Sequence, residues 1–123
     1  DLSLANIFGL IFSPLAWIIG IPWEEAGTIG TILGQKMAFN EFVAYVSLSP
    51  MIHNATLSPH SIAITSFALC GFSNLSSAGI LIGAFGSVAP ERRSWIARNA
   101  VRAILAGSLS NLTSATIAGL FLA

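Results

Sequence analysis

Long apolar runs, separated by short polar clusters, make up most of this chain. The first run, residues 4–21, has Pro14 near its middle, and a proline inside a helix removes a backbone donor and clashes with the preceding turn. Trp17 and Trp23 lie toward its end, and such amphipathic rings collect at the headgroup level of a bilayer. Residues 1–22 are therefore predicted to form an apolar helix that is either kinked or shorter and interfacial.

The second run, residues 23–52, is interrupted by Asn40 and Glu41. Pro22 directly precedes it and Glu24 and Glu25 stand in its first turn, which is typical of a helix start. The pieces on either side of the interruption, the second ending before Pro50, are about 16 and 9 residues long and would reach about 24 Å and 14 Å as helices. Because these lengths are too short for two full crossings, we predict a re-entrant helical hairpin with Asn40 and Glu41 near its tip.

The third run follows a loop. Prolines and polar residues predict loop structure across residues 50–60, and we assign 53–60 to an outer loop. Residues 61–90 then contain no Asp, Glu, Lys or Arg; as one straight helix they would reach about 45 Å, against a hydrocarbon core about 30 Å thick. We therefore predict a discontinuous transmembrane helix over 61–90, broken at residues 71–77.

The last region, residues 91–123, begins with a basic segment at 91–102 and continues as an uncharged run. Basic segments beside membrane spans tend to face the cytoplasm, and about 20 apolar residues suffice to cross the core as a helix. We predict a basic inner loop and a last transmembrane helix, with 91–102 cytoplasmic and the C-terminus outside. Counting crossings backwards, the 53–60 loop and the open end of the hairpin also face outward.

The composition is that of a protein that lies in lipid. Charged residues make up 8% of the chain and hydrophobic residues 54%, whereas a soluble domain carries about 25% charged residues. The predicted fold class is all-α integral membrane, multi-pass in the cell (inner or plasma) membrane. The zero net charge excludes the basic footprint of a nucleic-acid-binding protein, and the first residue, Asp1, suggests a fragment of a longer chain.

Residues that could catalyse a reaction are not grouped in the sequence. It lacks an H-E-x-x-H metal motif, a G-x-S-x-G nucleophile motif and paired aspartates. The single cysteine, Cys70, has neither a charge that would activate it nor an evident base, and we expect it to pack as a small apolar side chain. We predict that the protein is not an enzyme and that this chain holds no metal site.

Two apolar segments that are each interrupted midway are typical of a transporter site, because unwound backbone and half-helix ends meet near the membrane midplane. A carboxylate can accept two hydroxyl protons at once, and an amide can both donate and accept. The set of polar residues at the two interruptions therefore suits a neutral, hydroxyl-rich solute and would repel a phosphate. It comprises Glu41, the amides Asn40 and Asn74, and the hydroxyls Ser73, Ser76 and Ser77.

The residues at the hairpin tip also have structural interpretations. Asn40 suits the N-cap of the second helical piece, and Glu41 suits its first turn, where the helix dipole favours an acid. Lys36, one turn before Glu41, either pairs with it, which would lower the cost of burying both charges, or reaches outward. A supporting role for Asn40 and Lys36 in the site therefore stays a hypothesis.

The second interruption leaves the same alternatives open. Asn74 could simply satisfy the broken backbone, and Ser76 and Ser77 are residues that often hydrogen-bond between membrane helices. Phe72 could pack against neighbouring helices or serve as a stacking platform. Composition and spacing do not decide between these roles.

Two stretches resemble the concentrative nucleoside transporters. The stretch from Gly34 to Ala44 matches every fixed position of the family motif G-x-K-x-x-x-N-E-F-V-A, and Ala68 to Ile80 looks like its A-L-C-G-F-A-N-x-S-S-x-G-I segment. Ser73 departs from the usual Ala, and Ala78 from a larger aliphatic residue. The resemblance extends over essentially the whole chain, which looks like the C-terminal third of a bacterial-length member.

This resemblance implies roles for individual residues. Glu41 and Asn74 would bind the ribose hydroxyls of a nucleoside, Ser77 would lie close to the sugar, and Phe72 would pack against the bound nucleoside. Asn40, Lys36, Ser73 and Ser76 are possible supporting residues. The residues that read the base and the cation site would belong to an upstream part of the transporter.

The function that follows is the C-terminal transport-domain part of a cation-coupled nucleoside symporter, a secondary active transporter driven by sodium or protons and usually homotrimeric. Its expected partners are the nucleoside, the lipid bilayer and the rest of the transporter chain, with no cofactor besides the coupling Na+ or H+. Two alternatives remain: a non-transporting structural or oligomerising membrane helical module, and a transporter of another polyhydroxylated solute.

Overall fold

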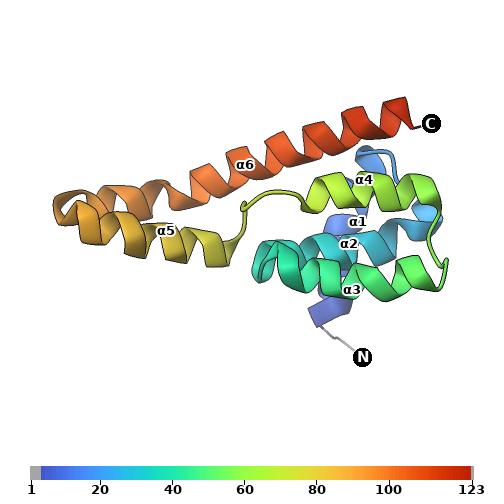
Figure 1. Cartoon of the computed structure of the whole chain (residues 1–123), viewed down its shortest axis with the longest axis horizontal. Helices are drawn as coiled ribbons and strands as arrows, with labels where there is room; N and C mark the ends of the chain where they lie inside the picture. Colours follow the sequence, from blue (N-terminus) through green and yellow to red (C-terminus); the bar gives the residue numbers. More distant parts are fainter. Residues whose placement is uncertain (1–3, 123) are drawn as a thin grey trace.

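The computed structural model describes residues 4–122, and over this range its regular elements are all helical (Figure 1). Residues 1–3 of the predicted first segment and residue 123 of the last lie outside the described residues. The elements are α1 (Leu4–Ile18), α2 (Trp23–Ala38), α3 (Glu41–His53), α4 (Pro59–Leu69), α5 (Leu75–Val88), the short 3-10 helix η1 (Pro90–Arg92) and α6 (Arg93–Phe121).

Helix α1 is continuous through Pro14, and the large change in chain direction comes after it. The axes of α1 and α2 differ by 119° across the residues between them, where Gly20 adopts a φ of 108° that side chains other than glycine rarely tolerate. The rings of Trp17 and Trp23 meet edge to face across this turn, with centroids 6.4 Å apart.

Helices α2 and α3 form a hairpin joined by Phe39 and Asn40, and they lie side by side in Figure 1. Asn40 is extended, and its side-chain oxygen accepts a hydrogen bond from the backbone N–H of Val43 at 3.0 Å, so it caps α3 as an asparagine at this position should. The expectation that this helix ends before Pro50 is wrong, since α3 continues to His53. Pro50 is exposed and stands in the last turn of α3, where its carbonyl accepts from Asn54 N.

Helix α4 begins where a serine precedes a proline. Ser58 is the N-cap and accepts a hydrogen bond from the backbone N–H of Ser61 at 3.2 Å, with Pro59 as the first helical residue. Residues 70–74 are not helical and separate α4 from α5. Leu75 to Ser77, expected in the interruption, instead form the first turn of α5. Cys70 lies in this break and is exposed, so the expectation that it packs as an apolar side chain is wrong.

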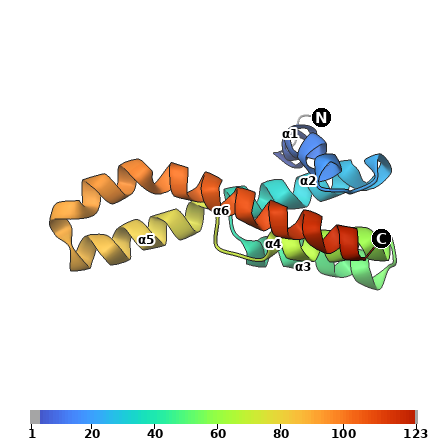
Figure 2. The ribbon, with the colours of Figure 1, turned by 90° about the horizontal axis from the view of Figure 1, so that it is seen from above.

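Helix α6 runs back along α5 and then crosses α4 (Figures 1 and 2). Helical structure begins at Pro90, so the basic segment that was expected to start as a loop is mostly the first turns of α6. The stretch Pro90–Phe121 is long and apolar enough to cross a membrane. Within the described residues it is the one helix that qualifies by itself, and α1 and α2 would make a second candidate if they were counted together as one bent span.

The chain divides into a packed half, residues 4–69 with residues 104–121, and an arm, residues 75–103, which projects away from it (Figure 2). In the packed half, large apolar side chains such as Ile29, Leu48 and Ile64 are fully buried. In the arm, Ser77 is buried, whereas Phe85 and the other large apolar side chains are mostly exposed. The break at residues 70–74 joins the two parts.

Candidate functional site

The tip of the α2–α3 hairpin meets the break between α4 and α5. Glu41 is the first residue of α3, and Asn74 is the N-cap of α5. The side-chain amide of Asn74 donates a hydrogen bond to Glu41 Oε2 at 2.8 Å. The two residues expected to bind the solute, which are 33 positions apart in the sequence, are therefore in direct contact.

Asn74 is held from a second side. Its side-chain oxygen accepts a hydrogen bond from the backbone N–H of Ser77 at 2.8 Å, which caps α5. Asn74 is fully buried, whereas Glu41 is partly exposed. The amide of Asn74 thus has a fixed orientation, with its oxygen toward its own helix and its nitrogen toward the carboxylate.

Two helix N-termini converge on the Glu41 carboxylate. Glu41 lies in the first turn of α3 and is bonded to the N-cap residue of α5. The free N–H groups at a helix N-terminus carry partial positive charge. An acidic side chain is a residue type that suits the first turn of a helix.

Lys36 places a positive charge at the C-terminal end of α4, on the other side of the break. Its ammonium, with the residue 5% exposed, donates a hydrogen bond to the carbonyl oxygen of Ala68 at 2.8 Å. Ala68 stands in the last turn of α4, where the helix dipole is negative. Both alternatives for Lys36 are therefore wrong: the buried side chain does not reach outward, and its ammonium bonds to the Ala68 carbonyl and forms no ion pair with Glu41, another of the described residues. The hairpin presents a cation to the end of α4 and an acidic residue to the start of α5.

The remaining expected residues divide into buried and exposed ones. Ser77 and Ser73 are buried, and Ser76 is exposed on the first turn of α5. Asn40 uses its side-chain oxygen to cap α3. Asn40 therefore has the capping role that was one of its two interpretations. Asn74 both caps α5 and bonds to Glu41.

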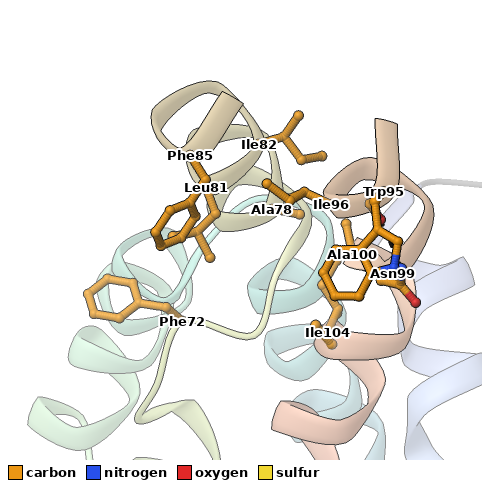
Figure 3. Close-up of a pocket in the computed structure, with 11 residues that line it drawn as sticks. Phe72, Ala78, Leu81, Ile82, Phe85, Trp95, Ile96, Asn99, Ala100 and Ile104 are labelled. Carbon is orange, nitrogen blue, oxygen red and sulfur yellow. Dashed lines mark hydrogen bonds between the residues drawn. The ribbon is translucent and has the colours of Figure 1, made fainter. Parts of the chain in front are cut away.

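Phe72 lies on the arm side of the break. It is 77% exposed and lines a cavity of about 290 Å³ between α5 and the beginning of α6 (Figure 3). Apart from Asn99, the side chains around this cavity are apolar. This cavity therefore offers mostly apolar surface, and neither Glu41 nor Asn74 is among the residues that line it.

Two residues that the sequence patterns did not single out also make contacts here, Asn111 with the break and Tyr45 with α4. Asn111 of α6 donates a hydrogen bond from its side-chain amide to Ser73 Oγ at 2.9 Å, and the Tyr45 hydroxyl donates to the carbonyl of Ser66 at 2.8 Å. Asn111 carried a signal, because polar side chains inside a membrane span normally have a specific partner. Tyr45 had no comparable signal.

Comparisons with known proteins identify the family of this chain. Residues 1–119 match the family model described as the C-terminus of Na+ dependent nucleoside transporters. Nucleoside permease NupC of Helicobacter pylori is 51% identical over 124 residues, covering 98% of this chain and 30% of the permease.

Solved structures give the same result. CNTnw in an inward-facing substrate-bound state is 52% identical, with a TM-score of 0.93 over 98% of this chain and 30% of that chain. A doubly substituted CNTnw in an outward-facing state gives a TM-score of 0.92 at 52% identity, with the same coverage. The chain thus spans about 30% of the length of these relatives. The family match, the identity and the shared fold together confirm the resemblance seen in the motifs: this chain belongs to the concentrative nucleoside transporter family and corresponds to a C-terminal portion of its members.

Proposed function

We propose that this chain is the C-terminal transport-domain part of a cation-coupled nucleoside symporter, and that Glu41 and Asn74 bind the ribose hydroxyls of the substrate near the membrane midplane. The observation that carries the proposal is the 2.8 Å hydrogen bond between Asn74 Nδ2 and Glu41 Oε2. This bond joins a carboxylate and an amide that lie at the interruptions of two separate apolar segments. The chain that contains them belongs to a family of nucleoside transporters.

The chemistry of the pair suits adjacent hydroxyl groups. A carboxylate has about four lone-pair positions, and an amide nitrogen has two N–H donors. The bond between Asn74 and Glu41 uses one of each, so acceptors and a donor remain for a ribose diol. The negative charge would repel a phosphate, which favours a nucleoside over a nucleotide.

The lengths of the helices favour a site inside the membrane. Helices α2 and α3 have 16 and 13 residues, which corresponds to about 24 Å and 20 Å, each less than the hydrocarbon core of about 30 Å. We propose that α2 and α3 form a re-entrant hairpin, and that α4 and α5 form one discontinuous transmembrane helix. In this arrangement residues 91–102 face the cytoplasm and the C-terminus lies outside.

The rest of the transporter would complete the site. This chain supplies the ribose-binding half, and upstream residues would read the base and hold the coupling Na+ or H+. A homotrimeric assembly in the lipid bilayer is part of the same proposal. Ser77 would lie close to the sugar and Phe72 would contact the bound nucleoside, because both adjoin Asn74 in the structure.

The proposal is tested by Glu41→Gln in the full-length transporter in proteoliposomes. Uptake of labelled uridine should fall about a hundredfold or more, since hydrogen bonds to charged groups contribute about 1.5–3 kcal/mol each and two hydroxyls would be affected. Glu91→Gln is the matched control, because Glu91 is an exposed carboxylate in η1, and its uptake should stay within about twofold of the unmodified protein.

Two results would contradict the proposal. Unchanged uridine uptake by Glu41→Gln, at equal abundance in the membrane, would remove Glu41 from the site. Absence of counterflow for labelled uridine and adenosine with the unmodified transporter would favour the structural module. Counterflow of sugars without nucleosides would instead indicate another polyhydroxylated substrate.

A further inference from the structure

The break at residues 70–74 is held by α6 as well as by the hairpin tip. Asn111 of α6 donates its side-chain amide to Ser73 Oγ at 2.9 Å. One turn earlier on the same helix face, Gly107 lies against Ser73: a Cβ added to Gly107 would stand 3.0 Å from the Ser73 Cβ. Gly107 and Asn111 thus form a socket that receives the buried side chain of Ser73.

The socket fixes a second residue of the break. Gly71 has a φ of 110°, and a Cβ placed on it would lie 2.8 Å from both the amide nitrogen and the oxygen of Asn111. Glycine is required here for both reasons, the backbone conformation and the contact. The Asn111 side chain therefore packs on Gly71 and bonds to Ser73, the two residues that flank Phe72 in the sequence.

We propose that Asn111 is a positioning residue of the ribose site, which acts through Ser73 on the neighbouring Asn74. This inference rests on the function proposed above, and it assigns to the last helix a part in substrate recognition. Asn74 follows Ser73 directly, and its backbone N–H is bonded to the carbonyl of Phe72 at 3.1 Å. The chain from Gly71 to Asn74 is thus a short, tightly held segment in which a shift of Ser73 passes to Asn74.

The interaction is specific to the residue found at position 73. A serine hydroxyl accepts the amide proton of Asn111, and an alanine there would leave the amide without this partner. The Asn111 side chain is partly buried. A shielded donor that loses its partner is destabilising, whereas replacing both partners by apolar groups can be nearly neutral. Ser73 and Asn111 should therefore behave as a coupled pair.

The experiment is a double-mutant cycle in the full-length transporter, with Ser73→Ala, Asn111→Leu and the double variant. Uridine dissociation constants are measured by calorimetry on purified protein, and KM and Vmax in proteoliposomes. Uptake of uridine is also compared with that of 2′-deoxyuridine and 3′-deoxyuridine. Ser87→Ala and Thr113→Val are the controls, because both hydroxyls donate within their own helix, to Ala84 and Leu109.

We expect each single variant to raise the uridine KM and Kd about three- to tenfold with little change in Vmax, and to reduce discrimination against a deoxynucleoside. The double variant should bind no more weakly than the worse single variant, since coupled residues do not add. The controls should stay within about twofold. If Asn111→Leu fails to reach the membrane, Ser73→Ala carries the test, because it removes the same bond without adding volume.

An unchanged KM and unchanged deoxynucleoside discrimination in Ser73→Ala would overturn the inference, and so would effects of the two substitutions that multiply. The result for Glu41→Gln separates this failure from that of the proposed function. If Glu41→Gln abolishes uptake while Ser73→Ala has no effect, the positioning role alone is wrong. If Glu41→Gln transports normally, the ribose site itself is wrong.

Discussion

The packed half and the arm use similar apolar sequences in different ways. Ile29 and Ile64 of the packed half are fully buried, whereas Ile80 and Val88 of the arm are 69% and 84% exposed. The difference shows that hydrophobicity alone does not define the core of this chain. The buried apolar side chains gather in the packed half, which also exposes others such as Leu10 and Phe42, whereas most large apolar side chains of the arm face outward. Outward-facing apolar surface of this extent marks contact with lipid or protein.

The candidate site lies where the two parts join. The packed half supplies Glu41 and Lys36 on a hairpin that is fixed by burial, and the break supplies Asn74, the N-cap of the helix with which the arm begins. A site at such a junction responds to any shift of the arm relative to the hairpin. The comparison between the two parts therefore yields predictions about both stability and transport.

The largest difference between the two parts is expected when one methyl group is added to a glycine in each of them. In the packed half, a Cβ on Gly30 would lie 2.7 Å from the backbone nitrogen of Ser13, whereas a Cβ on Gly83 in the arm would meet nothing within 4 Å. Gly30→Ala should lower the free energy of unfolding by about 3 kcal/mol, because the backbone of α1 cannot yield as a side chain can. Gly83→Ala should be neutral or raise it by up to about 1 kcal/mol.

Thermal unfolding of the purified full-length transporter in detergent measures both changes. If Gly83→Ala destabilised the protein as much as Gly30→Ala, the arm would be packed against the upstream part of the transporter as closely as α1 against α2. The comparison between a packed half and an outward-facing arm would then hold for this chain and fail for the whole protein.

Local features of the fold were predictable from the sequence. Asn40 is found as an N-cap, because a capping side chain bonds a backbone N–H only three residues further on. The uncharged stretch 61–90 is too long for one crossing, and the structure has a break within it. Such features depend on neighbouring residues or on length, and the sequence contains both.

Contacts between distant segments were not predictable in the same way. The bond of Lys36 to the Ala68 carbonyl and that of Asn111 to Ser73 join residues 32 and 38 positions apart, and no local rule selects these partners. The end of α3 was missed because a proline in the last turn of a helix is tolerated when it is exposed, as Pro50 is.

An intermediate effect is expected from Lys36→Met, which keeps the length of the side chain and removes its charge. Uridine uptake should fall about ten- to a hundredfold, because the bond to the Ala68 carbonyl ties the hairpin to the end of α4, and a charged hydrogen bond contributes about 1.5–3 kcal/mol. Arg102→Met is the control in the arm; this side chain is exposed on α6, and uptake should change less than about twofold. Equal uptake by both variants, at equal membrane abundance, would show that Lys36 does not hold the site.

The smallest effect is expected at the opposite end of the hairpin, where two adjacent glutamates differ in their contacts. Glu25 accepts hydrogen bonds from the backbone N–H of Ser58 at 2.9 Å and from its hydroxyl at 3.1 Å, whereas Glu24 is exposed. Glu25→Gln replaces one acceptor oxygen by a donor and removes a charge that favours the N-terminus of α4. It should lower the free energy of unfolding by about 1 kcal/mol.

Glu24→Gln should change the same quantity by less than about 0.5 kcal/mol, as is usual for surface substitutions. Denaturant unfolding of the full-length transporter gives both values, and hydrogen exchange at residues 58–62 locates the change. A loss confined to Glu25→Gln, with faster exchange at the start of α4, would show that the packed half is held at this end by a polar contact as well as by apolar burial. Equal values for the two variants would mean that apolar packing fixes α4 against α2 without help from Ser58.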